Sequence, residues 1–202
     1  MSIELKICGI NSEYIIKTIL ESGGCKYLGF VFYPPSPRNL SIQESKKITS
    51  KIPLEIKKVA VMVKPEIKFI KKIKDQFDYF QIYDSSPSEI KKIKLIFHKK
   101  IILAIKVKKR EDINLYKKYI GIADEFLFDS SGMEKSFSFD WEYLKNIEIK
   151  DWFLAGGINI NNLDLAQKIT KKIDISSGLE DNPGKKSPKK IFDFLEKIKS
   201  YD

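Results

Sequence analysis

Short apolar segments alternate with helical segments along the chain, and this alternation restricts the possible folds more than any other feature. Each apolar segment is rich in Ile, Val, Leu and Phe and precedes a stretch with helical spacing, which is the pattern of a parallel sheet. The predicted strands are Glu4–Cys8, Tyr27–Phe32, Lys58–Val63, Tyr79–Ile82, Ile101–Val107, Glu125–Asp129, Trp152–Ala155 and Lys172–Ser176. Eight such units in 202 residues predict a compact (β/α)8 TIM barrel, with residues 1–202 as a single domain.

Residues that favour helix starts stand between the predicted strands. Ser41 and Ser86 each precede a glutamate by three positions, so both predict capping boxes, and Pro87 suits a first helical position. The segment Asp112–Tyr119 has the weakest helical pattern. Other predicted helix starts are Ser12, Pro65, Asn161 and Ser187.

The composition excludes several classes of protein. Hydrophobic residues make up 43% of the chain, yet no apolar run approaches the roughly 20 residues of a membrane span. The only cysteines are Cys8 and Cys25, too few for a disulfide framework or a four-thiolate zinc site. The net charge of +10 comes from scattered lysines, and only Arg38 and Arg110 are arginines. Dispersed lysines are typical of solvated helix faces, so the charge does not by itself indicate nucleic-acid binding.

Residues with acid, base and anion-binding chemistry follow the predicted strands. In a (β/α)8 barrel the carboxyl ends of the strands gather around one mouth, where chemistry takes place. Gly156-Gly157 and Ser177-Gly178 follow the seventh and eighth strands, so their backbone N–H groups can approach a phosphate closely. The residues expected at this mouth are Cys8-Gly9, Tyr33–Asn39, Lys64, Tyr83-Asp84, Asp129-Ser130, Ala155-Gly156-Gly157 and Ser176-Ser177-Gly178.

Each of these residues also has an ordinary structural interpretation. A cysteine at a strand end is commonly a small buried apolar residue, and Cys25 keeps that interpretation. Asp129 also suits a turn or a cap, Arg38 a surface ion pair, and a Gly-Gly pair a tight connection. The pairing of Cys8 with Asp129 across one barrel mouth favours a site instead.

Several motifs occur in order along nearly the whole chain: "KICGI", "GFVFYPPSPRNLS", "AVMV", "FLFDSS", "FDW", "LAGGIN" and "DISSGLEDNPGKK". With them the sequence strongly resembles the phosphoribosylanthranilate isomerase family of tryptophan biosynthesis. The resemblance implies an Amadori rearrangement of N-(5′-phosphoribosyl)anthranilate to 1-(2-carboxyphenylamino)-1-deoxyribulose 5-phosphate. It also implies a reaction that needs no metal and no cofactor.

The resemblance assigns roles to particular residues. Asp129 matches the family's general acid, which protonates the sugar ring oxygen, and a carboxyl group needs a raised pKa for that task. Cys8 matches the general base, which as a thiolate removes the C2′ proton of the opened Schiff base. Arg38 matches the residue that holds the anthranilate carboxylate, a task for a planar two-pronged donor. Asp174 matches a position near the ligand and can also organise its loop.

Two stretches depart from the family's usual pattern. After the fourth strand the chain has Gln81-Ile82-Tyr83-Asp84 in place of a Gln-Leu-His-Gly-like stretch, so Tyr83 replaces a pocket histidine. A tyrosine still donates a hydrogen bond, and we expect altered tuning and not loss of function. Residues 130–138 lack the family's glycine-rich segment, which affects loop closure and turnover rate more than reaction type.

The sequence leaves alternatives open. The same barrel can serve as a non-catalytic phosphate-ligand-binding protein or as another phosphosugar isomerase or epimerase. Epimerases with a metal need His and acidic ligands, and these are scarce at the predicted strand ends. The expected partner is a small phosphorylated molecule, with no nucleic acid and no membrane, and the expected assembly is a monomer or a homodimer. The expected location is the cytoplasm.

Overall fold

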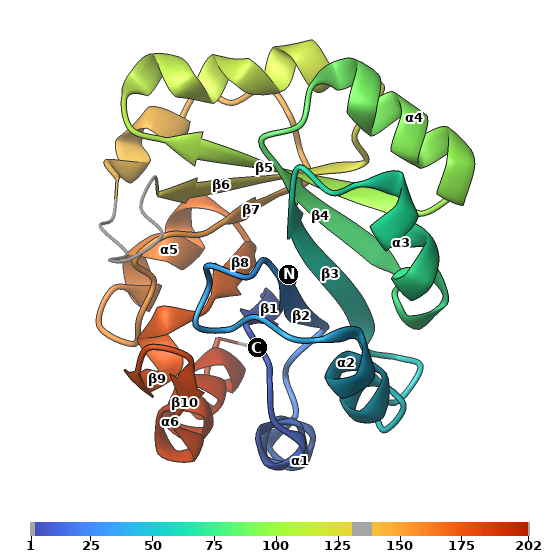
Figure 1. Cartoon of the computed structure of the whole chain (residues 1–202). Helices are drawn as coiled ribbons and strands as arrows, with labels where there is room; N and C mark the ends of the chain where they lie inside the picture. Colours follow the sequence, from blue (N-terminus) through green and yellow to red (C-terminus); the bar gives the residue numbers. More distant parts are fainter. Residues whose placement is uncertain (1–2, 131–138, 202) are drawn as a thin grey trace.

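Eight parallel strands close into a barrel in the order β1 to β8 (Figure 1). The computed structural model describes residues 3–130 and 139–201. The strands are β1 (Glu4–Cys8), β2 (Tyr27–Phe32), β3 (Lys57–Val63), β4 (Tyr79–Tyr83), β5 (Lys100–Val107), β6 (Glu125–Ser130), β7 (Trp152–Leu154) and β8 (Lys172–Ile175). The predicted (β/α)8 barrel is confirmed, and the strand boundaries agree with the sequence pattern to within about one residue.

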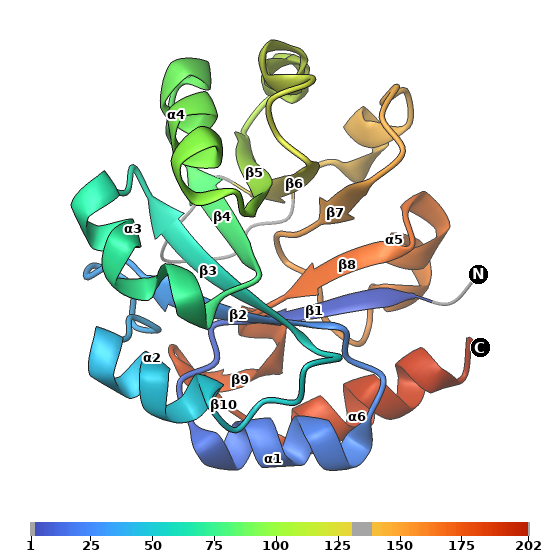
Figure 2. The ribbon, with the colours of Figure 1, turned by 90° about the vertical axis from the view of Figure 1, so that its right-hand side faces the viewer.

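Helices surround the barrel and cover its outer face (Figures 1 and 2). The α-helices are α1 (Glu13–Ser22), α2 (Ile42–Thr49), α3 (Ile67–Ile73), α4 (Pro87–Phe97), α5 (Leu163–Ile169) and α6 (Pro188–Lys199). The shorter 3-10 segments are η1 (Lys74–Gln76), η2 (Arg110–Tyr119), η3 (Trp141–Leu144) and η4 (Ser177–Leu179). The weak pattern at Asp112–Tyr119 thus corresponds to a 3-10 helix and not to an α-helix.

The predicted capping boxes are present at Ser41 and Ser86, where each serine accepts from the backbone of the third residue on. Ser12 and Ser187 precede α1 and α6 as predicted, but neither side chain makes a capping hydrogen bond.

Two predicted helix starts were wrong. Helix α3 begins at Ile67 after Glu66, so Pro65 lies outside it. Helix α5 follows Asn162 and not Asn161. The Asn162 side chain is engaged in the preceding loop, because its Nδ2 donates to the Gly157 carbonyl at 2.9 Å.

Side chains alternate between the inside of the barrel and the layer beneath the helices, as the two-residue period of a strand requires. The larger core lies between strands and helices, and it contains Phe77, which packs at 5.7 Å from Phe30 and 5.5 Å from Phe32 between ring centroids. Inside the barrel, Tyr27 meets Tyr79 and Phe153 edge to face. These rings fill the barrel interior, so a ligand can enter only from an end.

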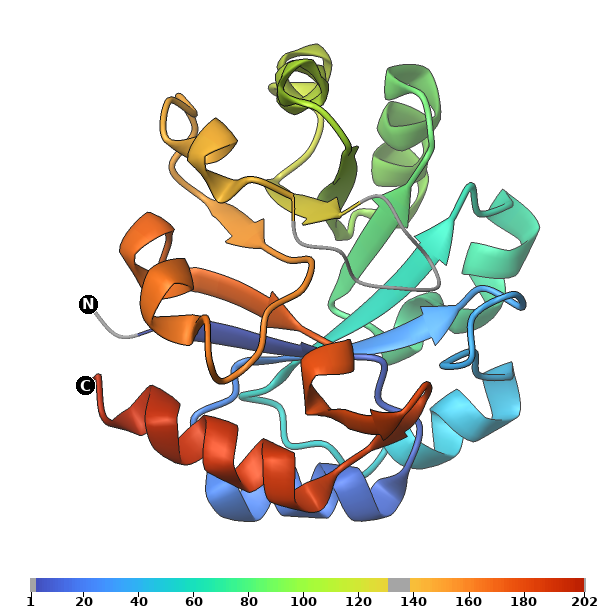
Figure 3. The same ribbon diagram turned by 90° about the vertical axis from the view of Figure 1, so that its left-hand side faces the viewer.

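The carboxyl ends of the strands lie together at one edge of the barrel (Figure 3). A small antiparallel hairpin of β9 (Glu180–Asn182) and β10 (Lys185–Lys186) follows η4 and lies near this edge. The hairpin is an addition to the repeating strand-helix unit, and α6 then packs beside α1. Among the described residues no helix is both long and apolar enough to cross a bilayer.

Replacing Phe77 with alanine should lower the free energy of unfolding by about 3–5 kcal/mol, because the removed ring leaves a cavity in a packed core. Phe77 is 1% exposed, whereas Phe192 on α6 is 53% exposed and provides a control with the same substitution. We expect Phe192→Ala to cost less than about 1 kcal/mol. Urea titration followed by circular dichroism measures both, and equal losses would contradict this account of the core.

Candidate active site at the carboxyl edge of the barrel

A cavity of about 820 Å³ opens at the carboxyl edge of the strands. Among the residues predicted for the site, those that line it are Cys8, Arg38, Asp129, Gly156, Gly157, Asp174 and Ser177. Gly178 does not line the cavity. The structure therefore brings together a thiol, carboxyl groups, a guanidinium and glycine loops from distant parts of the chain.

Cys8 reaches the cavity from the end of β1, and Gly29 on β2 leaves the room for it. The two residues are register partners in neighbouring strands. A Cβ atom on Gly29 would lie 2.9 Å from the Cys8 Sγ and 3.1 Å from the Lys6 Nζ, closer than side-chain contacts normally allow. The glycine is thus required for the thiol and the ammonium to share this space.

Lys6 lies two residues before Cys8 on the same inward face of β1. Its Nζ donates to Asp174 Oδ1 at 2.8 Å, and the lysine and aspartate side chains are 0% and 7% exposed. The pair follows from strand register, because Lys6 on β1 stands beside Asp174 on β8. Burial lowers the pKa of Lys6, but the Asp174 carboxylate outweighs it, so the pKa is raised and the ammonium stays charged.

The surroundings of Cys8 favour its neutral thiol over the thiolate. Burial raises its pKa above the ordinary value of 9.0, and the Asp174 charge adds to this, although Lys6 and Lys186 act in the opposite direction. The two ammonium groups therefore lower the pKa of Cys8 in part, but they do not cancel the increase that burial causes. A thiolate at this position needs further positive charge, such as that of a cationic ligand.

Asp129 near the end of β6 accepts a hydrogen bond at 2.9 Å from the Tyr83 hydroxyl on β4. The hydrogen bond spans strand β5, on which Ala104 is the register partner of Tyr83 and Lys106 that of Asp129. Gln81 Nε2 in turn donates to the Tyr83 hydroxyl at 3.1 Å. Tyr83 stands where the family usually has a histidine, and it donates the hydrogen bond that we expected from a tyrosine.

Burial raises the pKa of Asp129 to about 6, in spite of the Tyr83 hydrogen bond, which lowers it. The charge of Asp174 also raises it. The pKa of Tyr83 lies well above its usual 10.0 through burial and the neighbouring Asp129, so its hydroxyl remains a donor. A carboxyl group that titrates near neutral pH is suited to general acid catalysis.

Arg38 comes from the proline-containing loop after β2, and its guanidinium pairs with Glu180 on β9. The Arg38 Nε and Nη2 each lie 2.7 Å from a different oxygen of that carboxylate. Burial raises the pKa of Glu180, but Arg38 and Lys186 outweigh it and lower the pKa to about 2. Among the described residues Arg38 is the only arginine that lines the cavity, and a carboxylate holds it.

The glycine loops form the other side of the cavity. Gly156 and Gly157 have φ angles of 83° and 72°, a region that favours glycine, and a Cβ on Gly156 would lie 2.6 Å from the Ser130 nitrogen. A Cβ on Gly178 would lie 2.1 Å from the Ile158 carbonyl oxygen, so this glycine allows η4 to approach the β7 loop. Helix α5 has only 7 residues, and an anion site here would depend on the loops rather than on that helix.

Some residues of the site were not predicted from the sequence. Gly29, Glu180 and Lys186 were not singled out, although a glycine inside a strand pattern commonly marks a close approach. The predicted change in the loop at residues 130–138 falls mostly on residues outside those described. Within residues 3–130 and 139–201, no group of three or more His, Cys, Asp or Glu side chains is arranged to hold a metal ion.

Comparison with known proteins gives consistent matches over almost the whole chain. The sequence model of the family described as N-(5'phosphoribosyl)anthranilate (PRA) isomerase matches residues 5–197. The N-(5'-phosphoribosyl)anthranilate isomerase of Chelativorans sp. (strain BNC1) is 31% identical, covering 99% of this chain and 97% of that protein. The enzyme of the same name from Rhodopseudomonas palustris (strain TIE-1) is 33% identical, covering 96% of this chain and 97% of the relative.

Solved structures match in the same way. Phosphoribosyl anthranilate isomerase from Thermotoga maritima aligns with a TM-score of 0.88 at 28% identity, covering 98% of this chain and 99% of that one. Another phosphoribosyl anthranilate isomerase structure, in complex with reduced 1-(o-carboxyphenylamino)-1-deoxyribulose 5-phosphate, aligns with a TM-score of 0.82 at 28% identity. It covers 98% of this chain and 99% of its own.

Replacing Tyr83 with phenylalanine should raise the pKa of Asp129 above its value of about 6, because the hydrogen bond that stabilises the carboxylate is lost. The carbon-13 shift of the labelled Asp129 carboxyl group, followed against pH, measures this directly. Tyr14 is 65% exposed, so Tyr14→Phe serves as a control and should leave the titration unchanged. A fall in the Asp129 pKa in Tyr83→Phe would contradict the assigned role of the hydroxyl.

Proposed function

The chain belongs to the N-(5'-phosphoribosyl)anthranilate isomerase family, and we propose that Cys8 and Asp129 are the base and the acid of its reaction. The protein is an isomerase of tryptophan biosynthesis. The observation that carries the assignment of roles is the shared cavity, which both side chains line together with Arg38 and the glycine loops. The whole barrel, over residues 1–202, serves as the single catalytic domain.

The first step opens the sugar ring. Asp129 donates its proton to the ring oxygen while the C1′–O bond breaks, and the electron pair of the anthranilate nitrogen forms a C1′=N double bond. The product is a protonated Schiff base with a hydroxyl group in place of the ring oxygen. The pKa of about 6 supports this role, because a fraction of Asp129 is protonated near neutral pH.

The second step removes the proton from C2′. The Cys8 thiolate takes this proton, and its electron pair forms the C1′=C2′ bond as the iminium nitrogen becomes neutral, which gives an enolamine. Loss of the C2′ hydroxyl proton and protonation of C1′ then give the ketone. The positive charge of the Schiff base lies where it stabilises a thiolate, which the resting site does not favour by itself.

Other groups bind the substrate. Arg38 faces the anthranilate carboxylate, and the backbone of Gly156, Gly157 and Ser177, which line the cavity, binds the phosphate. Gly178, predicted for the same role, instead lets η4 approach the β7 loop. The backbone N–H groups of Gly156 and Gly157 donate to no other group among the described residues, which supports this assignment. Asp174 acts through Lys6, since its carboxylate keeps that ammonium charged beside Cys8.

The proposal extends to the partner, the assembly and the location of the protein. A small phosphorylated molecule is the partner, and nucleic acid and membranes are not. The assembly is a monomer or a homodimer, and a structure of monomers derived from a dimeric enzyme is known for the Thermotoga maritima relative. We place the reaction in the cytoplasm, where two unpaired cysteines such as Cys8 and Cys25 remain reduced.

Removing either catalytic group should reduce turnover of N-(5′-phosphoribosyl)anthranilate by about 10²–10⁴-fold, the range that general acid or base catalysis contributes. The changes are Cys8→Ala and Asp129→Asn, and Cys25→Ala is the matched control because Cys25 lies outside the cavity. The fluorescence of the anthranilate substrate provides the assay. Full activity in both site variants would refute the roles, and an inactive wild type would favour a ligand-binding barrel or another phosphosugar enzyme.

The pH profile should report the resting protonation states. At neutral pH the dominant pair is ionised Asp129 with a neutral Cys8 thiol, and the reactive pair is protonated Asp129 with a thiolate. Both pairs carry the same net charge, so the reactive fraction is constant between the two pKa values. We expect kcat/KM to rise with pH up to about 6, stay level, and fall above 9, because the Asp129 pKa is about 6 and the Cys8 pKa lies above 9.0.

The substrate phosphate also titrates near pH 6, so a variant must identify the lower break. Tyr83→Phe should move that break to higher pH, because it raises the Asp129 pKa and leaves the phosphate untouched. Steady-state rates between pH 5 and pH 10 in both proteins make the comparison. An identical lower break in both would assign it to the substrate.

A further inference from the structure

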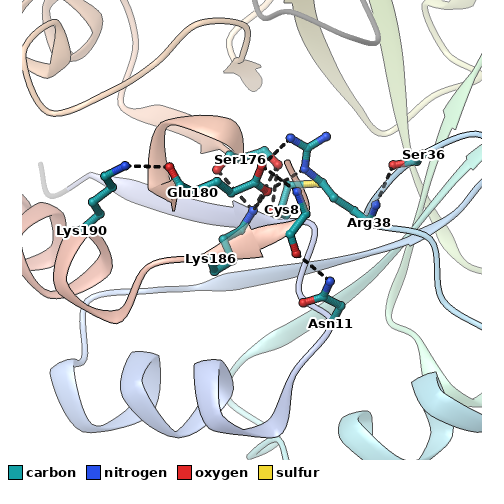
Figure 4. A network of polar contacts seen from close by, with 9 residues as sticks. Cys8, Asn11, Ser36, Arg38, Ser176, Glu180, Lys186 and Lys190 are labelled. Atoms are coloured by element: carbon teal, nitrogen blue, oxygen red, sulfur yellow. Dashed lines mark hydrogen bonds and ion pairs between the residues drawn. The ribbon is translucent and has the colours of Figure 1, made fainter. Parts of the chain in front are cut away.

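The Arg38 guanidinium is held from one side only (Figure 4). Its Nε and one Nη2 hydrogen donate to the two oxygens of Glu180, both at 2.7 Å. A guanidinium has five N–H donors in one plane, so three remain, on Nη1 and on the far side of Nη2. In residues 3–130 and 139–201 these three donors have no partner, and Arg38 lines the cavity. The free edge of the fork is the geometry that accepts a second carboxylate.

Glu180 has no remaining capacity to pair with anything else. Its Oε1 accepts from Arg38 Nε at 2.7 Å and from Lys186 Nζ at 2.5 Å. Its Oε2 accepts from Arg38 Nη2 at 2.7 Å and from the Gly184 nitrogen at 3.1 Å. These four bonds fill the lone-pair sites of a carboxylate, and the Glu180 side chain is 4% exposed. Rotation of Glu180 would break all of them at once, so it fixes the plane of the guanidinium.

Lys186 connects this pair to the strand that carries the thiol. Its side chain is 0% exposed, and besides Glu180 its Nζ donates to the Ser176 carbonyl at 3.2 Å. The Ser176 hydroxyl in turn donates to the Cys8 carbonyl at 3.0 Å. Lys186 thus ties the orientation of Arg38 to the end of β1, as the chain of contacts in Figure 4 shows.

The β9–β10 hairpin packs closely against the loop that carries Arg38. Gly184 has a φ of 77°, and a Cβ there would lie 2.4 Å from the Pro37 carbonyl oxygen, next to Arg38 in the chain. The Gly184 carbonyl also accepts from Asn11 Nδ2 at 2.9 Å. The hairpin therefore contacts both the loop after β1, through Asn11, and the loop after β2, through Pro37.

We propose that Glu180 and Lys186 are positioning residues that present Arg38 to a carboxylate on the aromatic ring of the substrate, and so select for that group. Glu180 occupies the Nε and Nη2 edge of the guanidinium, so the opposite edge is the one that can meet the ligand carboxylate. This inference rests on the proposed function, because it assigns the aromatic end of that substrate to Arg38.

The test compares two compounds in wild type and in Glu180→Gln. One is N-(5′-phosphoribosyl)anthranilate, and the other is N-(5′-phosphoribosyl)aniline, which lacks the carboxylate. For the anthranilate compound we expect KM to rise about 10-fold or more with kcat within about 3-fold, because a binding interaction and not the chemistry is weakened. For the aniline compound KM should change less than about 2-fold. If the aniline compound is not turned over, its constant as a competitive inhibitor replaces KM.

Asp193→Asn is the control, because it removes the same charge from an exposed pair with Lys189 on α6. It should leave KM and kcat unchanged for both compounds. Thermal unfolding establishes that each variant is folded. If Glu180→Gln does not fold, Lys186→Met replaces it as the test. It removes the ammonium that pairs with Glu180 and keeps a side chain of similar length, and we expect the same selective rise in KM.

Three outcomes would overturn the inference. An equal rise in KM for both compounds would show that Glu180 supports the cavity as a whole. An unchanged KM would show that Arg38 needs no partner, and a lower KM for the anthranilate compound would show that Glu180 competes with the substrate. A wild type that does not turn over the anthranilate compound refutes the proposed function instead.

Discussion

The pairing of β1 with β8 is the contact on which both the fold and the site depend. It closes the barrel, and its register sets Lys6 beside Asp174. The resulting ion pair is buried, and a buried ion pair is costly to break because one charge would be left without a partner. A shift of β1 by one residue would turn Lys6 and Cys8 to the outside of the barrel together. The closure that completes the fold therefore also places the thiol and the nearest cation.

Much of the fold could be predicted from the sequence because it depends on local patterns. Strand segments were recognised from short β-branched and aromatic runs, and helix starts at Ser41 and Ser86 from residues three positions apart. The order of strand and helix then left few possible topologies. The prediction failed at Asn161, whose backbone N–H donates to the Asn159 side chain within the loop, so that α5 begins later, after Asn162.

The contacts that set the chemistry could be predicted only in part, because they join residues far apart in the chain. Cys8 and Asp129 could be placed at one mouth, since each is the last residue of a predicted strand. That Arg38 pairs with Glu180, 142 positions later, depends on a hairpin that the repeating unit does not contain. Tyr83 on β4 reaches Asp129 on β6 across the intervening strand β5. Such contacts depend on register and side-chain size across strands, which periodicity does not specify.

The burial of Cys8 has a consequence for the lifetime of the protein under oxidative conditions. Peroxides and alkylating reagents attack thiolates, and they attack accessible ones fastest. Cys8 is 7% exposed and its raised pKa keeps it protonated while the cavity is empty. In the proposed mechanism the thiolate forms only beside the cationic Schiff base, which would also stand between the sulfur and an oxidant. Cys8 would thus be reactive only while a bound substrate shields it from oxidants.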